Sequence, residues 1–189
     1  MDVRVVAIGE EDWRAYRAVR LEMLADTPLA FGETLEHALA LDDAEWRFRA
    51  RRCATPGNAG WAAVAEDGRW LGTMSAFVHP VEGPFLVSVF VAPGHRGRAA
   101  GVADALLDAA VAWVGRQAER GTLLLHVHED NTRARAFYRR RGFVDTGLRV
   151  PYSLDETTDE VEMCLTFPAA PQFPAAPSFP AAPSFPGPP

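Results

Sequence analysis

Hydrophobic and polar positions recur with two different periods along the first part of the chain, and these periods predict strands and helices in turn. Residues Val3–Ile8 alternate as a half-buried strand does. The acids Glu10–Asp12 suit the first turn of a helix, because negative charge is favourable there. A further helical stretch is expected over Glu33–Cys53, with a break near Leu41 and Asp42. The buried face of the first helix consists of Trp13, Tyr16, Val19 and Met23, which recur three or four residues apart.

Three strands are expected in the middle of the chain. Gly60–Ala65 and Trp70–Val78 flank Asp67–Gly68, and Asp-Gly between two apolar runs is a strong signal for a β-hairpin. The next segment, Phe85–Val91, is rich in β-branched and aromatic residues and is followed by Pro93. These three strands should therefore pair antiparallel in chain order.

In the second half of the domain, turn residues and helix-capping residues mark where each helix and strand begins and ends. Glycine ends helices because it adopts left-handed conformations freely, and asparagine caps helix N-termini with its side chain. The predicted fold class is α+β, with a mixed, mostly antiparallel central sheet of about seven strands flanked by helices. The elements expected here are a helix through Val102, Leu106, Ala109 and Trp113 that Gly121 ends, the strand Thr122–His128, a helix from Asn131 to Arg141 closed by Gly142, and strands near Phe143–Arg149 and Glu160–Phe167.

Residues 167–189 differ from the rest of the chain in composition. They repeat FPAAPQ, FPAAPS, FPAAPS and FPGPP, carry no charge and hold nine of the 15 prolines. Proline at this density excludes helix and central strand, which leaves a polyproline II or flexible tail after one domain at residues 1–166. Each repeat contains P-x-x-P, the spacing of peptides that dock in aromatic grooves, although no basic residue flanks it. Docking of this Pro-rich tail and a solvated extension are both left open.

The charged residues narrow the choice of function. All 19 basic residues are arginines, because the sequence contains no lysine. This excludes a Schiff-base lysine, a pyridoxal phosphate anchor and the lysine of a phosphate-binding P-loop. The 25 acidic residues leave a net charge of −6, which argues against nucleic-acid binding by bulk charge and favours cationic small substrates.

The two cysteines, Cys53 and Cys164, lie far apart and form no C-x-x-C metal or redox motif. A reducing compartment is therefore the expectation. No apolar run approaches the roughly 18 to 20 residues that span a bilayer, so a cytoplasmic protein with no membrane partner is expected.

Small residues and arginines fill the segment Val91–Ala103, between a buried strand and a long helix. Main-chain N–H groups at a helix N-terminus attract anions, and small side chains let a pyrophosphate reach the backbone. By itself, this segment indicates either a phosphate site or a strand-to-helix turn that is rich in glycine for steric reasons.

A second motif, L-x-V-x-x-x-N-x-x-A-x-x-F-Y-x-x-x-G-F, follows at Leu125–Phe143. Together with the preceding loop, it resembles the Gcn5-related N-acetyltransferase (GNAT) family, in which a strand, an R/Q-x-x-G-x-G/A loop, a helix and this motif occur in order. The resemblance covers Val89–Phe143 by motif and residues 1–166 by element order. It implies the acyl-CoA N-acyltransferase fold and acetyl-CoA as a co-substrate.

The resemblance also implies which residues hold acetyl-CoA, with the strand binding the pantetheine arm and the loop binding the pyrophosphate. Two registers of the loop remain open. Arg96 to Gly101 leaves Ala99 where glycine is usual, whereas Arg98-x-x-Gly101-x-Ala103 fits fully and makes the loop two residues longer. The implied cofactor-binding residues are Val89, Phe90, Val91, Arg96, Gly97, Arg98, Ala99, Ala100, Gly101, Val102, Ala103, Asn131 and Tyr138.

Tyr138 is, by the same resemblance, the candidate acid that faces the leaving sulfur. A phenol of pKa about 10 can protonate a thiolate, whose own pKa is about 8.5, without ionising first. The attacking ammonium, of pKa about 10.4, needs a base, and the candidate is His126, where some family members carry a glutamate. The structural alternatives are a partly buried helix tyrosine and a sheet histidine whose hydrogen bonds are satisfied.

The acceptor amine should bind beside segments that vary within the family, here Leu29–Thr34 and Pro151–Ser153. Phe31 and Glu33 are the candidate substrate-binding residues, and Glu33 or Glu36 would pair with a cationic amine. The alternative is a helix-entry acid beside a core phenylalanine.

Two rival classes of function draw on the same part of the chain. His126 and His128 have the i, i+2 spacing of some metal sites, but no third ligand follows by spacing, so no metal is expected. Arg133, Arg135 and Arg139–Arg141 could contact nucleic acid, but charges on one amphipathic helix usually form a solvated face. No nucleic-acid partner is therefore expected.

These features predict an enzyme that moves the acetyl group of acetyl-CoA directly onto a primary amine of a small molecule or peptide within a ternary complex. Neither cysteine lies in a motif that supports a covalent acyl-enzyme. A non-catalytic acyl-CoA sensor or adaptor is the alternative. The identity of the amine and the formation of a homodimer are left open.

Overall fold

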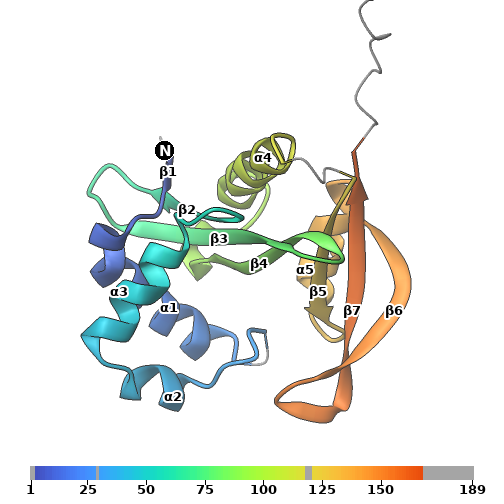
Figure 1. Ribbon diagram of the computed structural model, residues 1–189, viewed down its shortest axis with the longest axis horizontal. Coiled ribbons are helices and arrows are strands. Elements are labelled where there is room, and N and C mark those ends of the chain that lie inside the picture. Colours follow the sequence, from blue (N-terminus) through green and yellow to red (C-terminus); the bar gives the residue numbers. More distant parts are fainter. Residues whose placement is uncertain (1–2, 29, 118–120, 168–189) are drawn as a thin grey trace, which may run out of the picture.

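The computed structural model describes residues 3–28, 30–117 and 121–167. In this part of the chain a seven-stranded sheet is flanked by five α-helices, which confirms the predicted fold class (Figure 1). The strands are β1 (Arg4–Ala7), β2 (Asn58–Val64), β3 (Trp70–His79), β4 (Gly83–Val91), β5 (Thr122–His128), β6 (Val144–Tyr152) and β7 (Asp155–Thr166). The helices are α1 (Trp13–Asp26), α2 (Leu35–Ala40), α3 (Asp43–Arg52), α4 (Val102–Val114) and α5 (Thr132–Arg140), with short 3-10 turns at η1 (Glu10–Asp12) and η2 (Pro93–His95).

The strands lie in the order β1-β2-β3-β4-β5-β7-β6. Every neighbouring pair is antiparallel except β4 and β5, which are parallel. The three middle strands β2, β3 and β4 pair in chain order, as the hairpin signal predicts. The parallel pair therefore joins an antiparallel four-stranded half to an antiparallel three-stranded half.

Most element boundaries follow the local signals in the sequence. The predicted break between α2 and α3 is present, because the Asp42 carboxylate caps α3 by accepting from the Glu45 N–H at 2.8 Å. Asn131 caps α5 in the same way, accepting from the Ala134 N–H at 3.1 Å. Strand β7 begins at Asp155, five residues before the predicted strand at Glu160.

The predicted end of the helix after Val102 is wrong. Helix α4 ends at Val114, with Gly115 as its C-cap, and not at Gly121. The Gln117 N–H bonds the Val114 carbonyl at 2.9 Å, which is the i→i−3 pattern of a turn and not of an α-helix. Of the repeat tail expected at residues 167–189, Phe167 is described, with its N–H bonded to the Gly121 carbonyl at 3.0 Å, and the rest lies outside the described residues. No described helix is long and apolar enough to cross a membrane.

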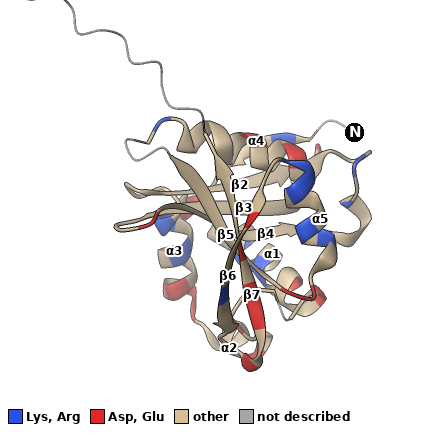
Figure 2. Cartoon of the chain, turned by 90° about the vertical axis from the view of Figure 1, so that its right-hand side faces the viewer, with Lys and Arg blue, Asp and Glu red and all other residues tan. Residues whose placement is uncertain are grey.

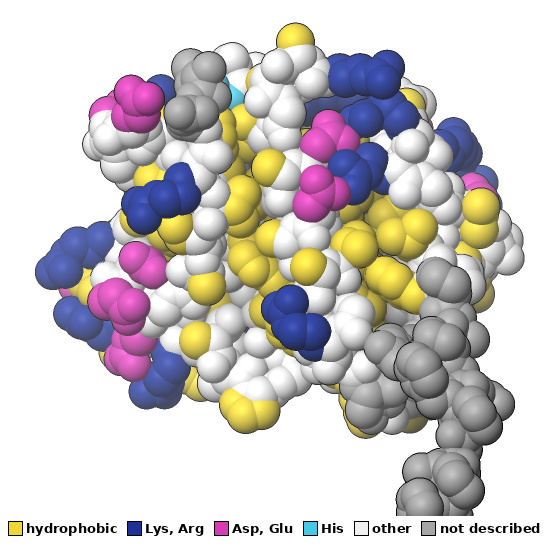
Figure 3. Space-filling model, turned by 90° about the horizontal axis from the view of Figure 1, so that it is seen from above, with side chains coloured by type: hydrophobic (Ala, Val, Ile, Leu, Met, Phe, Trp, Pro, Cys, Tyr) yellow, Lys and Arg dark blue, Asp and Glu magenta, His cyan; other side chains and the backbone are white. Residues whose placement is uncertain are grey.

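Each face of the sheet carries its own hydrophobic core. Helices α1–α3 pack on one face, where Trp46 is fully buried and meets Tyr16 edge-on at 6.3 Å between ring centroids. Helices α4 and α5 pack on the other face, where Trp61 and Trp113 meet at 6.1 Å. Seen from the side on which α4 lies, hydrophobic side chains extend across the middle of the surface, and most basic side chains lie toward its edges (Figure 3).

Strand β4, which borders the other half of the sheet, contains a bulge in its pairing with β3. Pairing between β3 and β4 passes from Ser75–Val87 to Thr73–Phe90, so two residues of β4 lie opposite one of β3. Ser88, inside this bulge, has a φ of 53°, a left-handed conformation that is uncommon for serine. The register of β4 with β5 holds at a single pair, Phe85 and Leu124. Beyond it, the edge of β4 that faces β5 has no strand partner, and the sheet opens there.

Candidate active site

A cavity of about 480 Å³ occupies the opening between β4 and β5. Its volume is in the range of ligand pockets, and most of its lining comes from the two strands and the N-terminal ends of α4 and α5. The segment after α1 contributes Thr27, Ala30 and Phe31. The sequence-predicted residues that line it are Phe31, Val89, Phe90, Val91, Arg96, Gly97, Arg98, Ala103, His126, Asn131 and Tyr138.

The N-terminus of α4 forms one end of this cavity. Gly101, with a φ of 69°, caps the helix, and the first helical hydrogen bond runs from the Ala105 N–H to the Gly101 carbonyl at 2.9 Å. The N–H groups of Val102, Ala103 and Asp104 therefore have no acceptor within the helix. No atom lies within 4 Å of the position that a Cβ would take at Gly101. Free amides, an open approach and the positive end of a helix are the features that an anion site requires.

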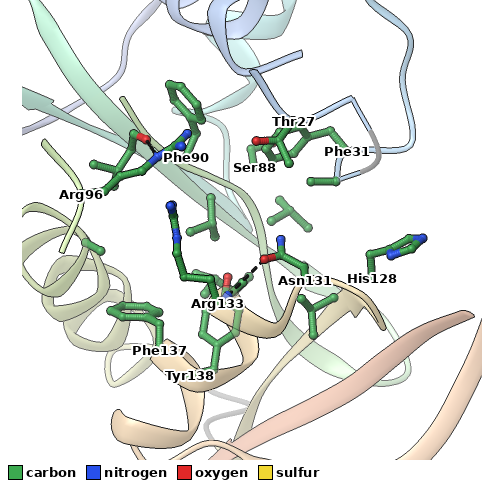
Figure 4. A pocket seen from close by; sticks show the side chains of 18 of the residues that line it. Thr27, Phe31, Ser88, Phe90, Arg96, His128, Asn131, Arg133, Phe137 and Tyr138 are labelled. Carbon is green, nitrogen blue, oxygen red and sulfur yellow. Dashed lines mark hydrogen bonds between the residues drawn. The ribbon is translucent and has the colours of Figure 1, made fainter. Parts of the chain in front are cut away.

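Arginines surround this end of the cavity but differ in their partners. The Nε of Arg96 donates to the Val91 carbonyl at 2.6 Å, and its guanidinium also bonds the Asp26 carboxylate, so Arg96 fastens the loop to the C-terminus of α1. Arg98 and Arg133 have no hydrogen bond or ion pair within the described residues, and Arg133 points into the cavity (Figure 4). Burial, with a smaller contribution from Arg96, lowers the pKa of Arg133, as expected for a shielded cation beside another cation.

Asn131 and Tyr138 bring two polar groups from α5 to the middle of the cavity. The Asn131 Oδ1 is occupied by the cap of the helix, and its amide nitrogen points into the cavity (Figure 4). Tyr138 is only 5% exposed, and its ring packs against Phe137 and Phe143 at 5.3 and 5.4 Å between centroids. Burial raises the pKa of Tyr138, so its phenol keeps its proton at neutral pH and is available as a donor.

The two histidines of β5 have different surroundings. His126 lines the cavity, its side chain is 30% exposed, its ring meets the ring of Phe85 edge-on, and its Nε2 lies 3.4 Å from a carboxylate oxygen of Glu162. His128 is buried, with its Nδ1 accepting from the Asp130 N–H at 3.2 Å and its Nε2 3.1 Å from the Thr158 hydroxyl. Within the described residues, no group of three metal-ligating side chains gathers around either of them.

Glu33 lies outside the cavity lining and makes two strong ion pairs. One carboxylate oxygen accepts from Arg20 at 2.7 Å and the other from Arg49 at 2.7 Å. Although burial acts to raise it, the hydrogen bonds from Arg49 and Arg20 lower the pKa of Glu33. Arg20 also reaches the Ser88 hydroxyl at 3.5 Å and lies over the Phe31 ring. Glu33 therefore holds the arginine that connects the β4 bulge to Phe31.

We expect Glu33→Gln to destabilise the fold by about 2 kcal/mol at pH 7, because two charge-assisted hydrogen bonds are weakened in a partly buried site. Because the pKa of Glu33 is lower in the folded state than in the unfolded state, its ionised carboxylate stabilises the fold at pH values above the unfolded-state pKa, near 4.3. This stabilisation is lost as the pH falls through the folded-state pKa. The difference from wild type should therefore shrink below about pH 4. Denaturant unfolding at pH 7 and below about pH 4 measures this difference in the free energy of unfolding. Glu36→Gln, at an exposed position, is the matched control. Equal losses in the two variants would contradict this role.

Two features of the site are not apparent from the sequence. Arg133, like Arg98, has no hydrogen bond or ion pair within the described residues, and its place two residues after the cap of α5 is the signal that points to it. Glu162 lies 36 residues from His126 along the chain, and only the antiparallel register of β5 with β7 places them opposite each other.

Comparisons with known proteins agree with this geometry. The model of the acetyltransferase (GNAT) family matches residues 17–143. No curated protein matches the chain significantly. A GCN5-related N-acetyltransferase from Kribbella flavida superposes with a TM-score of 0.69 at 24% identity, over 87% of this chain and 98% of that one. The protein yncA from Salmonella typhimurium, solved with its cofactor acetyl-CoA, gives 0.71 at 16% identity over 93% and 100%. Spermidine N-acetyltransferase from Vibrio cholerae, solved with CoA and spermine, gives 0.67 at 16% identity over 87% and 95%.

Proposed function

The chain belongs to the GNAT family of acetyltransferases, and we propose that its cavity binds acetyl-CoA across the opening between β4 and β5 for direct transfer to an amine. Its function is that of an acetyl-CoA-dependent N-acetyltransferase. The observation that carries the proposal is one continuous cavity with an anion site at the α4 N-terminus and with Tyr138 and His126 in its wall. The acceptor is a primary amine of a small molecule or peptide.

The residues at the α4 end fit the phosphates of CoA. The free N–H groups of Val102, Ala103 and Asp104 would receive the pyrophosphate, and the unpaired guanidinium groups of Arg98 and Arg133 would balance its charge. These contacts favour the register Arg98-x-x-Gly101-x-Ala103, because Arg96 is already committed to Val91 and Asp26. Bound acetyl-CoA supplies a thioester, a carbonyl carbon activated toward attack by an amine.

The edge of β4 would hold the pantetheine arm. Residues Val89–Val91 follow the bulge at Ser88, where β4 has separated from β5, so the main-chain groups on that edge are available to an extended ligand. A main-chain N–H on this strand would also receive the negative charge that develops on the thioester oxygen, a contribution of about 3 kcal/mol per donor in other acyl-transfer enzymes.

Two side chains would move the protons. His126 would take a proton from the acceptor ammonium, directly or through one water, so that the amine can attack. Tyr138 would give its phenolic proton to the sulfur as the C–S bond breaks and the new C–N bond forms. The attacking nitrogen loses its second proton as the amide forms, and this proton balances the one given by Tyr138. Within the described residues neither cysteine lines the cavity, which favours transfer without an acyl-enzyme.

We expect His126→Ala to lower kcat/KM for the amine about 100-fold or more and to flatten the acidic limb of the pH profile. A base that is already protonated at acidic pH cannot accept the proton of the ammonium, and alanine removes this base altogether. Steady-state kinetics from pH 5 to 9 measure both effects. His37→Ala, at an exposed histidine outside the cavity, is the control. An unchanged profile would remove His126 from the mechanism.

Release of free thiol from acetyl-CoA, measured on a panel of primary amines with the full-length chain, tests the function as a whole. We expect amine-dependent release with at least one member of a panel that includes polyamines, amino acids, aminoglycosides and peptide N-termini. Tight binding of acetyl-CoA without release on any amine would contradict catalysis.

A further inference from the structure

Glu162 is a buried carboxylate that no arginine neutralises. It is 8% exposed, and among the described residues its one ion-pair partner is His126. Other shielded acids of this arginine-rich chain pair with arginines, as Glu33 does with Arg20 and Asp104 with Arg140. A buried carboxylate without a strong cation costs folding free energy. Glu162 is therefore shielded from solvent without the arginine that the other shielded acids have.

The strand register fixes Glu162 beside His126. The two residues are direct partners across β5 and β7, so their side chains leave the sheet on the same face. Acidic residues are spaced along β7 (Figure 2), and Glu162 is the one whose carboxylate reaches this histidine. Its second oxygen accepts from the Thr146 hydroxyl of β6 at 2.8 Å. The carboxylate is thus held from one side by a hydroxyl and presented to the imidazole on the other.

The ring that His126 contacts on β4 carries no charge. The Phe85 ring of β4 meets the imidazole edge-on at 5.5 Å, and His79 of β3 lies on another side of that phenylalanine, with its Nδ1 3.2 Å from the Glu82 carboxylate. His128, two residues further along β5, bonds Thr158 instead. Glu162 is therefore the titratable group that acts on His126 directly within the described residues.

This contact favours one neutral tautomer of His126. A carboxylate can only accept, so a hydrogen on Nε2 suits Glu162 best, and Nδ1 is then left unprotonated. An unprotonated ring nitrogen is what a general base needs, and a carboxylate on the opposite nitrogen stabilises the imidazolium that forms. The proton from the acceptor ammonium would go to Nδ1, and Glu162 would keep its charge throughout.

We propose that Glu162, anchored by Thr146, is a positioning residue that holds His126 as the Nδ1-accepting base of the transfer reaction. This inference rests on the proposed function, because it assigns Glu162 a role only through the base. The neighbouring β7 carboxylate Glu160, which lies opposite His128, has no such role and serves as the matched control.

A double-mutant cycle on the full-length protein tests the inference. Glu162→Gln should lower kcat/KM for the amine about tenfold or more, with an unchanged Kd for acetyl-CoA, whereas Glu160→Gln should stay within about twofold of wild type. In the His126→Ala background, Glu162→Gln should change the rate by less than about twofold, because a residue that acts through His126 has nothing left to act on. Nitrogen NMR of the ligand-free protein should show an unprotonated Nδ1 in wild type and a tautomer mixture in Glu162→Gln.

Three results would overturn the inference, and they differ in what else they overturn. A Glu162→Gln variant that behaves like Glu160→Gln refutes only the positioning role. Equal losses in the wild-type and His126→Ala backgrounds show a structural role instead. Full activity of His126→Ala refutes the base and the inference together. If Glu162→Gln does not fold, Thr146→Val replaces it in the cycle, and a severalfold loss confined to the wild-type background is the expected result.

Discussion

Ala103→Glu is expected to weaken the binding of acetyl-CoA about 1,000-fold, or about 4 kcal/mol, while leaving the fold intact. Ala103 lies in the first turn of α4, and it lines the cavity where three helix N–H groups lack acceptors. A carboxylate there would meet those amides itself and repel the pyrophosphate. The same carboxylate stabilises a helix N-terminus by about 0.3 to 1 kcal/mol, so lost binding cannot be attributed to unfolding.

Calorimetric titration with acetyl-CoA, together with thermal unfolding, measures both parts of this expectation. Ala112→Glu is the matched control, because it adds the same charge at an exposed position of the same helix outside the cavity. We expect it to bind acetyl-CoA within about twofold of wild type. Wild-type affinity in Ala103→Glu would mean that the phosphates bind elsewhere.

Tyr138→Phe is expected to lower kcat about 100-fold while leaving the Kd for acetyl-CoA within about twofold of wild type. The ring keeps its contacts with Phe137 and Phe143, and the change removes only the phenolic hydroxyl, which we propose serves the leaving sulfur. Because burial raises the pKa of Tyr138, its protonated form persists through alkaline pH. No loss of activity linked to this phenol should therefore occur below about pH 10.

The matched control for this change is Tyr16→Phe. Tyr16 is a second shielded tyrosine, whose pKa burial also raises, but it lies on α1 outside the cavity. Rates of thiol release under saturating acetyl-CoA compare the two variants. An equal and small effect of both would show that Tyr138 is a packing residue and that another group protonates the sulfur.

Local signals in the sequence account for most of the fold. Alternating apolar positions mark the strands, and caps such as Asp42 and Asn131 mark helix starts, because these effects act between residues a few positions apart. The end of α4 escapes prediction, since two glycines could stop the helix and only the turn bonds after Gly115 decide between them. The left-handed backbone conformation of Ser88 could not be predicted from the sequence either, because serine has no preference for that conformation.

The site is predictable only where it is local. The α4 loop and the α5 motif are contiguous segments, so the sequence alone predicts acetyl-CoA contacts for their residues, and several of these residues line the cavity. Partners that meet across the fold could not be assigned. Glu33 receives Arg20 from α1 and Arg49 from α3, and its engagement with both is set by how three helices pack. Glu162 meets His126 because of the register between β5 and β7, and the sequence does not reveal this register.

A single-turnover experiment tests the central claim most directly, with the protein in excess over acetyl-CoA that is labelled in its acetyl group and with an amine found in the thiol-release panel. Direct transfer predicts that the label passes to the amine as an amide at the rate of thiol release, and that acid-quenched protein carries no label at any time. Label that appears first on the protein, or that leaves only as acetate, would contradict direct transfer to an amine in the cavity between β4 and β5.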